Sequence, residues 1–195
     1  MSDLSSALRN EGISLDEIAL SRLNRFVELL EEWNGVHNLT GAKNRKEIEK
    51  NIIDSLIPTT FVSPPDSLLD VGTGAGFPGL ILAIAWPRCE TVLCEPLNKR
   101  AAFLRLAALE LGLSKVRVER LRVERLHHKP FALISSRAVT DTALLLRLTE
   151  HLADRSTRWL LYKGSRLGEE LRAFEAAEEL RIVERPPRRY LLLRP

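Results

Sequence analysis

Cysteine is scarce in this sequence: the 195 residues include only two, Cys89 and Cys94. They lie five positions apart, and an odd offset along a strand places side chains on opposite faces. We therefore expect no disulfide between them. Neither cysteine lies in a metal-binding or nucleophile motif, so both are interpreted as small core residues.

Histidine is also sparse, and the spacing of His37, His127, His128 and His151 matches no metal-binding pattern. Adjacent residues such as His127 and His128 normally point apart. We therefore expect no metal. The sequence also lacks a G-x-S-x-G turn and a Ser/His/Asp order, so nothing in it favours a hydrolase.

Long hydrophobic runs are absent as well. The longest uncharged stretch, Val71 to Pro87, holds four glycines and two prolines, which are incompatible with a membrane-spanning helix of about 20 residues. The first residues, Met1 to Leu4, show no basic region before an apolar run, which argues against a secretory signal. We expect a cytoplasmic protein that does not associate with a membrane.

The composition that is present is ordinary for a globular protein, with 45% hydrophobic and 28% charged residues. The length suits one domain with a helical extension but not two full domains. A net charge of +3 and a pI of about 9.1 are compatible with a polyanionic partner without requiring one.

Basic residues gather in two stretches, either of which suits a phosphate-binding face. The first contains Arg117, Arg120, Arg122, Arg125, His127, His128 and Lys129, and the second contains Arg181, Arg185, Arg188, Arg189 and Arg194. Glu119, Glu124 and Glu184 lie among them, so a salt-bridged solvated surface is an equally good interpretation.

Residues 1–60 are predicted to form an N-terminal helical extension. The run Ser14-Leu15-Asp16-Glu17 matches a capping box. Apolar residues then recur every three or four positions as far as Gly35, which predicts an amphipathic helix that ends there. A second helix is predicted over about 45–57, stopping at Pro58.

Residues 61–195 alternate short apolar runs with helical segments, which is typical of βαβ units. Strands are predicted near 67–71, 90–95, 115–119, 131–136, 157–162, 181–184 and 190–194, and helices near 78–86, 98–111, 141–152 and 166–179. The pattern predicts an α/β, Rossmann-like fold: a seven-stranded, mostly parallel sheet with an antiparallel last strand, in one compact unit.

A glycine-rich turn follows the first predicted strand, in the run from Leu68 to Gly79. Glycines such as Gly72 and Gly74 permit positive φ and close approach of the backbone to a ligand. The run also satisfies the dinucleotide pattern G-x-G-x-x-G. Asp70, just before the first glycine, is unfavourable beside a pyrophosphate but compatible with the amine and sulfonium of S-adenosylmethionine. This favours S-adenosylmethionine.

Three further residues follow the predicted strands. Glu95 ends the second strand, where a carboxylate can accept both ribose hydroxyls, although a solvated loop glutamate is the alternative. Arg137 follows the fourth strand at the ligand crevice; it serves a ligand, neutralises a carboxylate, or does both. Lys163 ends the fifth strand, either to meet RNA phosphate or only to lead into a helix.

Several motifs in one order resemble the bacterial small-subunit ribosomal RNA methyltransferase G family, also called glucose-inhibited division protein B, over roughly residues 12 to 193. The matching pieces are Trp33-Asn34 with Asn38-Leu39-Thr40, Asp54-Ser55-Leu56, Leu69 to Gly79, Lys99-Arg100 with Phe103-Leu104, Arg122-Val123-Glu124, Ser136-Arg137-Ala138 and Lys163-Gly164.

The resemblance implies a class I, S-adenosylmethionine-dependent methyltransferase that modifies N7 of one guanosine in small-subunit (16S) ribosomal RNA, as naked RNA or in a 30S particle. The family's cofactor contacts fall on Gly72, Phe77, the pair Val123-Glu124 and Arg137, and its ribose-binding acid falls on Glu95. Gly74 belongs to the same turn. We expect no general base among the protein's residues, because guanine N7 carries no proton, and we expect a monomer.

The sequence departs from the family pattern at three places. Asn51 stands where the family commonly has histidine, which puts any role of that histidine in doubt here. Glu95-Pro96 replaces a usual Asp-Ser. The side chain of Glu95 is one methylene longer than that of the aspartate, and the carboxylate is kept. Leu121 replaces a small residue before Arg122, beside the expected adenine pocket.

Two other functions are compatible with the sequence. The Asn51 change and the basic stretches suit an RNA-binding or ribosome-assembly protein on a degenerate methyltransferase fold, although the intact glycine turn argues against it. The literal G-x-G-x-x-G suits an NAD-dependent oxidoreductase. A cytosine-C5 methyltransferase is disfavoured, because the sequence has no cysteine at the end of a strand that borders the cleft, where the nucleophile would be needed. No Asp/Asn-Pro-Pro-aromatic run, typical of exocyclic-amine enzymes, follows the fourth strand.

Overall fold

The computed structural model describes residues 4–137, 141–163, 179–186 and 188–194. The elements in chain order are α1 (Leu4–Asn10), α2 (Glu17–His37), α3 (Arg45–Leu56), the 3-10 helix η1 (Ile57–Thr60), β1 (Ser67–Val71), α4 (Gly79–Ala85), β2 (Glu90–Cys94), α5 (Asn98–Glu110), β3 (Val116–Glu119), η2 (Val123–Arg125), β4 (Leu133–Arg137), α6 (Thr142–Thr149), η3 (Glu150–Leu152), β5 (Arg158–Lys163), β6 (Glu179–Arg185) and β7 (Arg188–Arg194).

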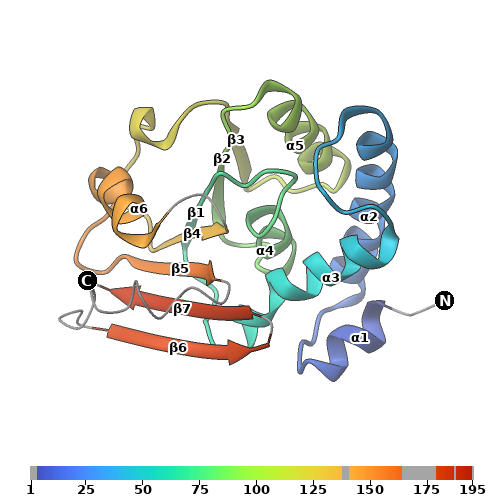
Figure 1. Ribbon diagram of the computed structural model, residues 1–195, viewed down its shortest axis with the longest axis horizontal. Coiled ribbons are helices and arrows are strands. Elements are labelled where there is room, and N and C mark those ends of the chain that lie inside the picture. The colour runs from blue at the N-terminus through green and yellow to red at the C-terminus, as the bar shows by residue number, and fades with distance from the viewer. Residues whose placement is uncertain (1–3, 138–140, 164–178, 187, 195) are drawn as a thin grey trace.

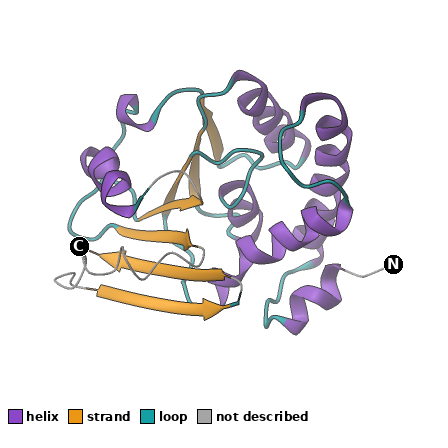
Figure 2. Cartoon of the chain, viewed as in Figure 1, coloured by secondary structure: helices purple, strands orange, loops and turns teal. Residues whose placement is uncertain are grey.

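The strands form one seven-stranded sheet in the order β3-β2-β1-β4-β5-β7-β6, flanked by helices (Figures 1 and 2). Strands β1 to β5 pair in parallel, whereas β7 lies antiparallel between β5 and β6. The prediction of a mostly parallel sheet with an antiparallel last strand is confirmed. The chain therefore has the predicted α/β, Rossmann-like fold.

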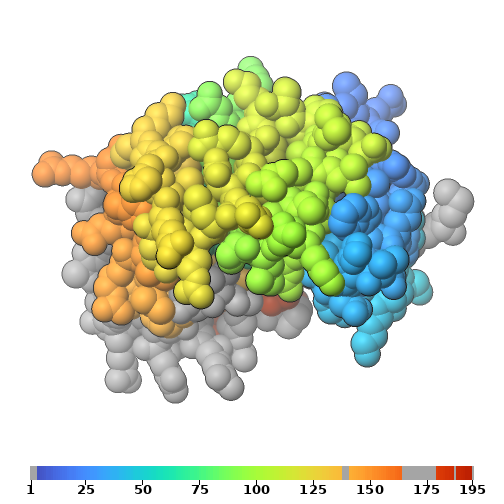
Figure 3. Space-filling model, turned by 90° about the horizontal axis from the view of Figure 1, so that it is seen from above, coloured from blue at the N-terminus to red at the C-terminus, as the bar shows by residue number. Residues whose placement is uncertain are grey.

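Alternation along the strands builds two hydrophobic clusters, one on each face of the sheet. Leu68 and Leu160 join α4 and the N-terminal helices in one cluster. Leu69 and Leu161, one position further along each strand, join α6 and the segment after β3 in the other. In Figure 3 that segment, yellow, lies between α5 and α6. Helices α2 and α3 belong to the first cluster and pack on α4 and α5, which separate most of their length from the sheet.

Helix boundaries correct several expectations. Asp16, not Ser14, caps α2, and its carboxylate accepts a hydrogen bond of 2.7 Å from the Ala19 amide. The helix continues past Gly35 to His37 and ends where Asn38 adopts a left-handed φ of 50°. Helix α1 was not predicted. The predicted helix 166–179 lies outside the described residues up to 178, and Glu179 begins strand β6 instead.

Register brings the ends of the central strands together. Val71, the last residue of β1, pairs with Cys94 of β2 on one side and with Ser136 of β4 on the other. The residues that follow, Gly72 and Glu95, and the final residue of β4, Arg137, therefore reach the same carboxyl edge of the sheet. Ligands of open α/β sheets bind at this edge.

Candidate functional site

The glycine turn connects β1 to α4 and has positive φ at three glycines: 66° at Gly72, 60° at Gly74 and 103° at Gly76. The Gly72 amide donates to the Cys94 carbonyl at 2.8 Å, which ties the turn to the end of β2. A Cβ added at Gly74 would find no atom outside its chain neighbours closer than the Gly72 carbonyl oxygen, 4.0 Å away. The turn therefore presents its backbone to open space, as close approach to a ligand requires.

Asp70 lies beneath this turn rather than beside a ligand. It is fully buried, and its carboxylate accepts from the Gly79 amide at 2.8 Å and from the Ser135 hydroxyl at 2.6 Å. Burial raises the pKa of Asp70 to about 6, although these hydrogen bonds oppose the shift. Asp70 therefore does not meet a pyrophosphate directly, and the expectation that its charge disfavours a dinucleotide there is wrong: the carboxylate holds the start of α4 against β1.

Glu95 follows β2 and turns back onto the glycine turn. Its two carboxylate oxygens accept from the Gly74 amide at 3.0 Å and from the Leu97 amide at 2.8 Å, and the residue is only 2% exposed. A carboxylate has about four acceptor positions, so two backbone donors leave capacity for further hydroxyl donors. Ribose binding by Glu95 stays a prediction, and the observed position beside Gly74 fits it.

Val123 and Glu124 lie in η2, after β3. Val123 is buried and Glu124 is exposed. The Cys94 thiol lies 3.2 Å from the Leu121 carbonyl oxygen, which joins this segment to the end of β2 near Glu95. Burial raises the pKa of Cys94 to about 12, so this thiol is not a nucleophile at neutral pH. Val123 shares a hydrophobic cluster with Val71 and Cys94, the last residues of β1 and β2, and its place beside an adenine ring stays a prediction.

Arg137 is directed toward the N-terminal helices. One of its terminal nitrogens, Nη1, lies 3.1 Å from Asn51 Oδ1 and 3.3 Å from Asp54 Oδ2, both on α3. The guanidinium also packs over the ring of Phe77 in the glycine turn, 5.0 Å from its centroid. Burial lowers the pKa of Arg137, while Asp54 opposes this shift. Arg137 thus neutralises a carboxylate, as one interpretation expected, and it borders the turn.

Asp54 is the centre of a network that the residue patterns did not predict. Besides Arg137, it accepts from Arg188 Nε at 3.1 Å and from the Tyr190 hydroxyl at 2.8 Å, both on β7. The next residue, Ser55, accepts at its carbonyl from the Tyr162 hydroxyl at 2.8 Å. The Asp54-Ser55-Leu56 motif therefore joins α3 to the end of β4 and to β5 and β7. The signal in the sequence was Asp54 itself, a carboxylate beside the apolar residues of α3, which indicates a buried partner.

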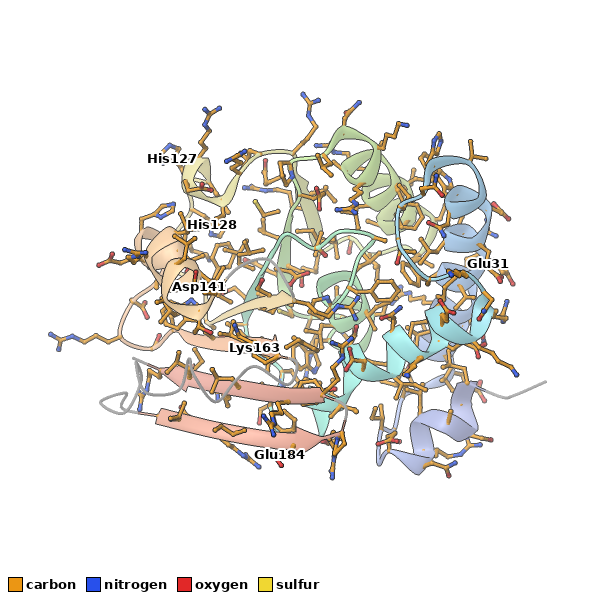
Figure 4. All side chains as sticks on the ribbon, viewed as in Figure 1. Glu31, His127, His128, Asp141, Lys163 and Glu184 are labelled. Atoms are coloured by element: carbon orange, nitrogen blue, oxygen red, sulfur yellow. The ribbon has the colours of Figure 1, made fainter. Side chains whose placement is uncertain are left out.

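Lys163 ends β5 and pairs in register with Arg189 of β7. Figure 4 shows it at that strand end, well away from His127 and His128 on the segment between β3 and β4. His128 stacks on Phe131, with ring centroids 4.3 Å apart. An RNA contact of Lys163 stays a prediction.

A pocket of about 900 Å³ is lined in part by Arg137, whose guanidinium also packs over Phe77 of the glycine turn. It is lined by Glu11, Thr40, Gly41, Ala42, Lys46, Glu47, Glu49, Lys50, Asn51, Ile53, Asp54, Ile57, Arg137, Arg185, Pro186, Arg188 and Tyr190. The described residues contain no group of three or more metal-ligating side chains. Within the same ranges, no helix is long and apolar enough to span a membrane.

Part of the first basic stretch forms ion pairs or hydrogen bonds on the surface. Arg117 contacts Glu119 at 2.8 Å, and Lys129 contacts Glu90 at 3.7 Å. Arg120 donates to the Asn98 side chain at 3.2 Å. These contacts fit the salt-bridged interpretation for those residues, and surface pairs of this kind add little stability.

Known proteins resemble the chain over nearly its full length. A family model for GidB, described as rRNA small subunit methyltransferase G, matches residues 19–186. A relative named ribosomal RNA small subunit methyltransferase G, from Wolinella succinogenes, is 49% identical over 192 residues, covering 98% of this chain and 97% of the relative. Its namesake from Aliarcobacter butzleri is 43% identical over 169 residues, 87% of each chain.

Solved structures support the same fold. A methyltransferase from Geobacter sulfurreducens superposes with a TM-score of 0.64 at 14% identity, covering 87% of this chain and 88% of that one. Coclaurine N-methyltransferase bound to N-methylheliamine and SAH gives 0.57 at 13% identity, covering 93% and 71%. These two likenesses concern the fold alone. The family model and the relatives go further, and the chain belongs to the GidB family of rRNA small subunit methyltransferases G.

Proposed function

We propose that the chain transfers a methyl group from S-adenosylmethionine to N7 of a guanosine in small-subunit ribosomal RNA, acting as a monomer in the bacterial cytoplasm. The observation that carries this proposal is the open glycine turn, which is tied to the end of β2 and has the Glu95 carboxylate hydrogen-bonded to Gly74. Membership of the GidB family supports the substrate class.

The residues around the turn divide the binding of the cofactor between them. Gly72 and Gly74 allow the backbone to approach the amino-acid part of the ligand, and Glu95 accepts the ribose hydroxyls. Val123 and Glu124 flank the adenine. When bound, S-adenosylmethionine supplies a methyl group on a sulfonium, which is electrophilic without assistance from a metal.

Phe77 and Arg137 border the same turn on the side of the pocket. Arg137 stays protonated at neutral pH even though burial lowers its pKa, because a guanidinium titrates far above that range. It therefore serves to orient, either the methionine carboxylate or the acceptor nucleotide, rather than to exchange protons. Phe77 keeps the guanidinium in place from one face.

No general base is needed for this reaction. Guanine N7 offers a lone pair and has no proton to lose, so the residues would contribute by orienting N7 toward the methyl group that S-adenosylmethionine would supply, rather than by exchanging a proton. Lys163, at the end of β5, is assigned to RNA phosphate.

The decisive experiment maps methylation. Small-subunit rRNA from a deletion strain should lack one N7-methylguanosine, and the wild-type gene should restore it. Isothermal titration with S-adenosylmethionine separates the proposal from its alternative, because a binding-only protein on a degenerate fold gives no saturable heat. Saturable heat without any restored methylation would instead favour a different acceptor.

A further inference from the structure

The pocket beside α3 lies at the sheet edge that also carries the glycine turn. Its volume of about 900 Å³ exceeds what a single small ion needs and falls within the range of about 300–1,000 Å³ typical of ligand sites. Arg137 lines it, and the same guanidinium packs on Phe77 of the glycine turn. The pocket and the glycine turn are therefore neighbours that share Arg137.

Positive charge predominates in the pocket once its ion pairs are counted. Two arginines, Arg137 and Arg188, share the single carboxylate of Asp54. Three further cations line the pocket, and no carboxylate of the described residues lies within 4.0 Å of them: Lys46, Lys50 and Arg185.

Most of the acidic residues in the pocket are already engaged. Glu49 pairs with Arg45 at 3.1 Å. Glu47 accepts from the Lys43 amide at 2.8 Å, at the start of α3. Only Glu11 has neither kind of contact among the described residues. Glu47 keeps its negative charge, because an amide donor is neutral. The lining therefore carries five cations against four carboxylates, and this excess of positive charge favours an anion.

Helical spacing arranges this charge in a row. Lys46, Lys50 and Asp54 are four residues apart and so lie on one side of α3, which runs beside the carboxyl ends of β4 and β5 (Figure 1). The two lysines are exposed, whereas Asp54 is buried against Arg137. The row leads from solvent to the arginine that borders the glycine turn, a path that suits a chain with regularly spaced negative charges.

We propose that this pocket takes the acceptor segment of the RNA substrate. Phosphates contact Lys46, Lys50 and Arg185, and the nucleotide to be modified reaches the side of Arg137. This inference rests on the proposed function, and it assigns RNA binding to the α3 side of the molecule rather than to the basic stretch after β3.

The test uses the full-length protein with Lys46 and Lys50 both changed to alanine. The matched control changes Arg147 and Arg155 to alanine, which also removes two exposed positive charges. Arg147 lies in α6 and Arg155 just before β5. In Figure 1, α6 and the start of β5 lie on the left, whereas α3 lies on the right. The readouts are KM and kcat for methylation of small ribosomal subunits, the salt dependence of RNA binding, and the dissociation constant of S-adenosylmethionine.

We expect KM for the subunit to rise roughly tenfold in the lysine variant, with kcat and cofactor affinity unchanged. The slope of log K against log salt should fall by about 1.4, since each contact to single-stranded phosphate contributes about 0.7. Equal behaviour of the lysine variant and the control overturns the inference. Loss of cofactor affinity in the lysine variant also overturns it, because the pocket would then serve the cofactor. A wild-type protein without any methylation refutes the proposed function instead.

Discussion

Gly79, at the first residue of α4, offers a stringent test of how the glycine turn is built. A Cβ added there would lie 2.4 Å from Asp70 Cβ, 2.6 Å from Asp70 Oδ2 and 2.6 Å from Leu93 Cδ2. Both neighbours are fully buried in the sheet, so neither can swing into solvent. Gly79→Ala must therefore push α4 away from β1, or β1 away from its partners.

Two costs add in this variant. Overpacking a well-packed core costs about 1–3 kcal/mol. Displacement also stretches the 2.8 Å hydrogen bond from the Gly79 amide to Asp70, and a hydrogen bond to a charged group is worth about 1.5–3 kcal/mol. We expect a loss of about 3–5 kcal/mol in the free energy of unfolding, a large part of the 5–15 kcal/mol typical of a domain.

Gly35 provides the matched control, because it lies in α2 with no atom within 4 Å of an added Cβ and without a positive φ. Gly35→Ala should stabilise the protein by about 0.5–1 kcal/mol through helix propensity. Urea unfolding followed by circular dichroism measures both variants, and titration with S-adenosylmethionine shows whether movement of the turn weakens binding. An unfolding free energy of Gly79→Ala within 1 kcal/mol of wild type would refute the packing argument.

Three further predictions concern charged groups. Asp54→Ala should lower the free energy of unfolding by about 3 kcal/mol, the low end for a broken buried pair, because Arg188 is still 38% exposed. Asp54→Asn should lose less, since its amide oxygen can still accept from Tyr190. Thermal unfolding of both variants checks this order, and equal losses contradict it. Burial raises the pKa of Asp70 to about 6, so its contribution to stability is full below about pH 4 and declines by about 3 kcal/mol as pH rises through 6. Asp70→Asn should remove this decline when the free energy of unfolding in urea is measured between about pH 4 and 8. The same pH dependence in the variant and the wild type would count against the buried charge. Arg137→Lys should weaken binding and slow single-turnover methylation without adding an ionisation between about pH 6 and 9, whereas a steep rise in that range, abolished by replacing one histidine, would show that a base is required.

The sheet was predictable because its signals are local. All seven strands overlap predicted ones, although β3 and β6 alternate apolar with charged residues where the other five contain short apolar runs. The change from strand to helix periodicity indicated their order along the chain. Cap positions were less predictable, since Ser14 and Asp16 both suit an N-cap and only packing of α2 decides between them. Helix α1 is seven residues long, too short for a clear period.

The site was predictable where it depends on the turn and not where it depends on tertiary pairing. Gly72, Gly74 and Glu95 follow strand ends, and parallel register alone brings them together. The direction of Asp70 could not be inferred in the same way. The side chain of a strand residue points to one face of the sheet or to the other. The Gly79 amide lies on the face where α4 packs, and only the tertiary structure shows that Asp70 points to that face.

For Arg137 the sequence predicts the position but not the partners. Its place at the end of β4 follows from the chain, but its partner Asp54 comes from α3, more than eighty residues earlier, and no local pattern links the two. Asn51, which stands where the family commonly has histidine, is a second partner of the same guanidinium. A neutral amide accepts from Arg137 at every pH, whereas a protonated histidine would repel it. The departure that seemed to question function thus gives Arg137 one partner that does not titrate, and the base-free mechanism needs that arginine held in place throughout the neutral range.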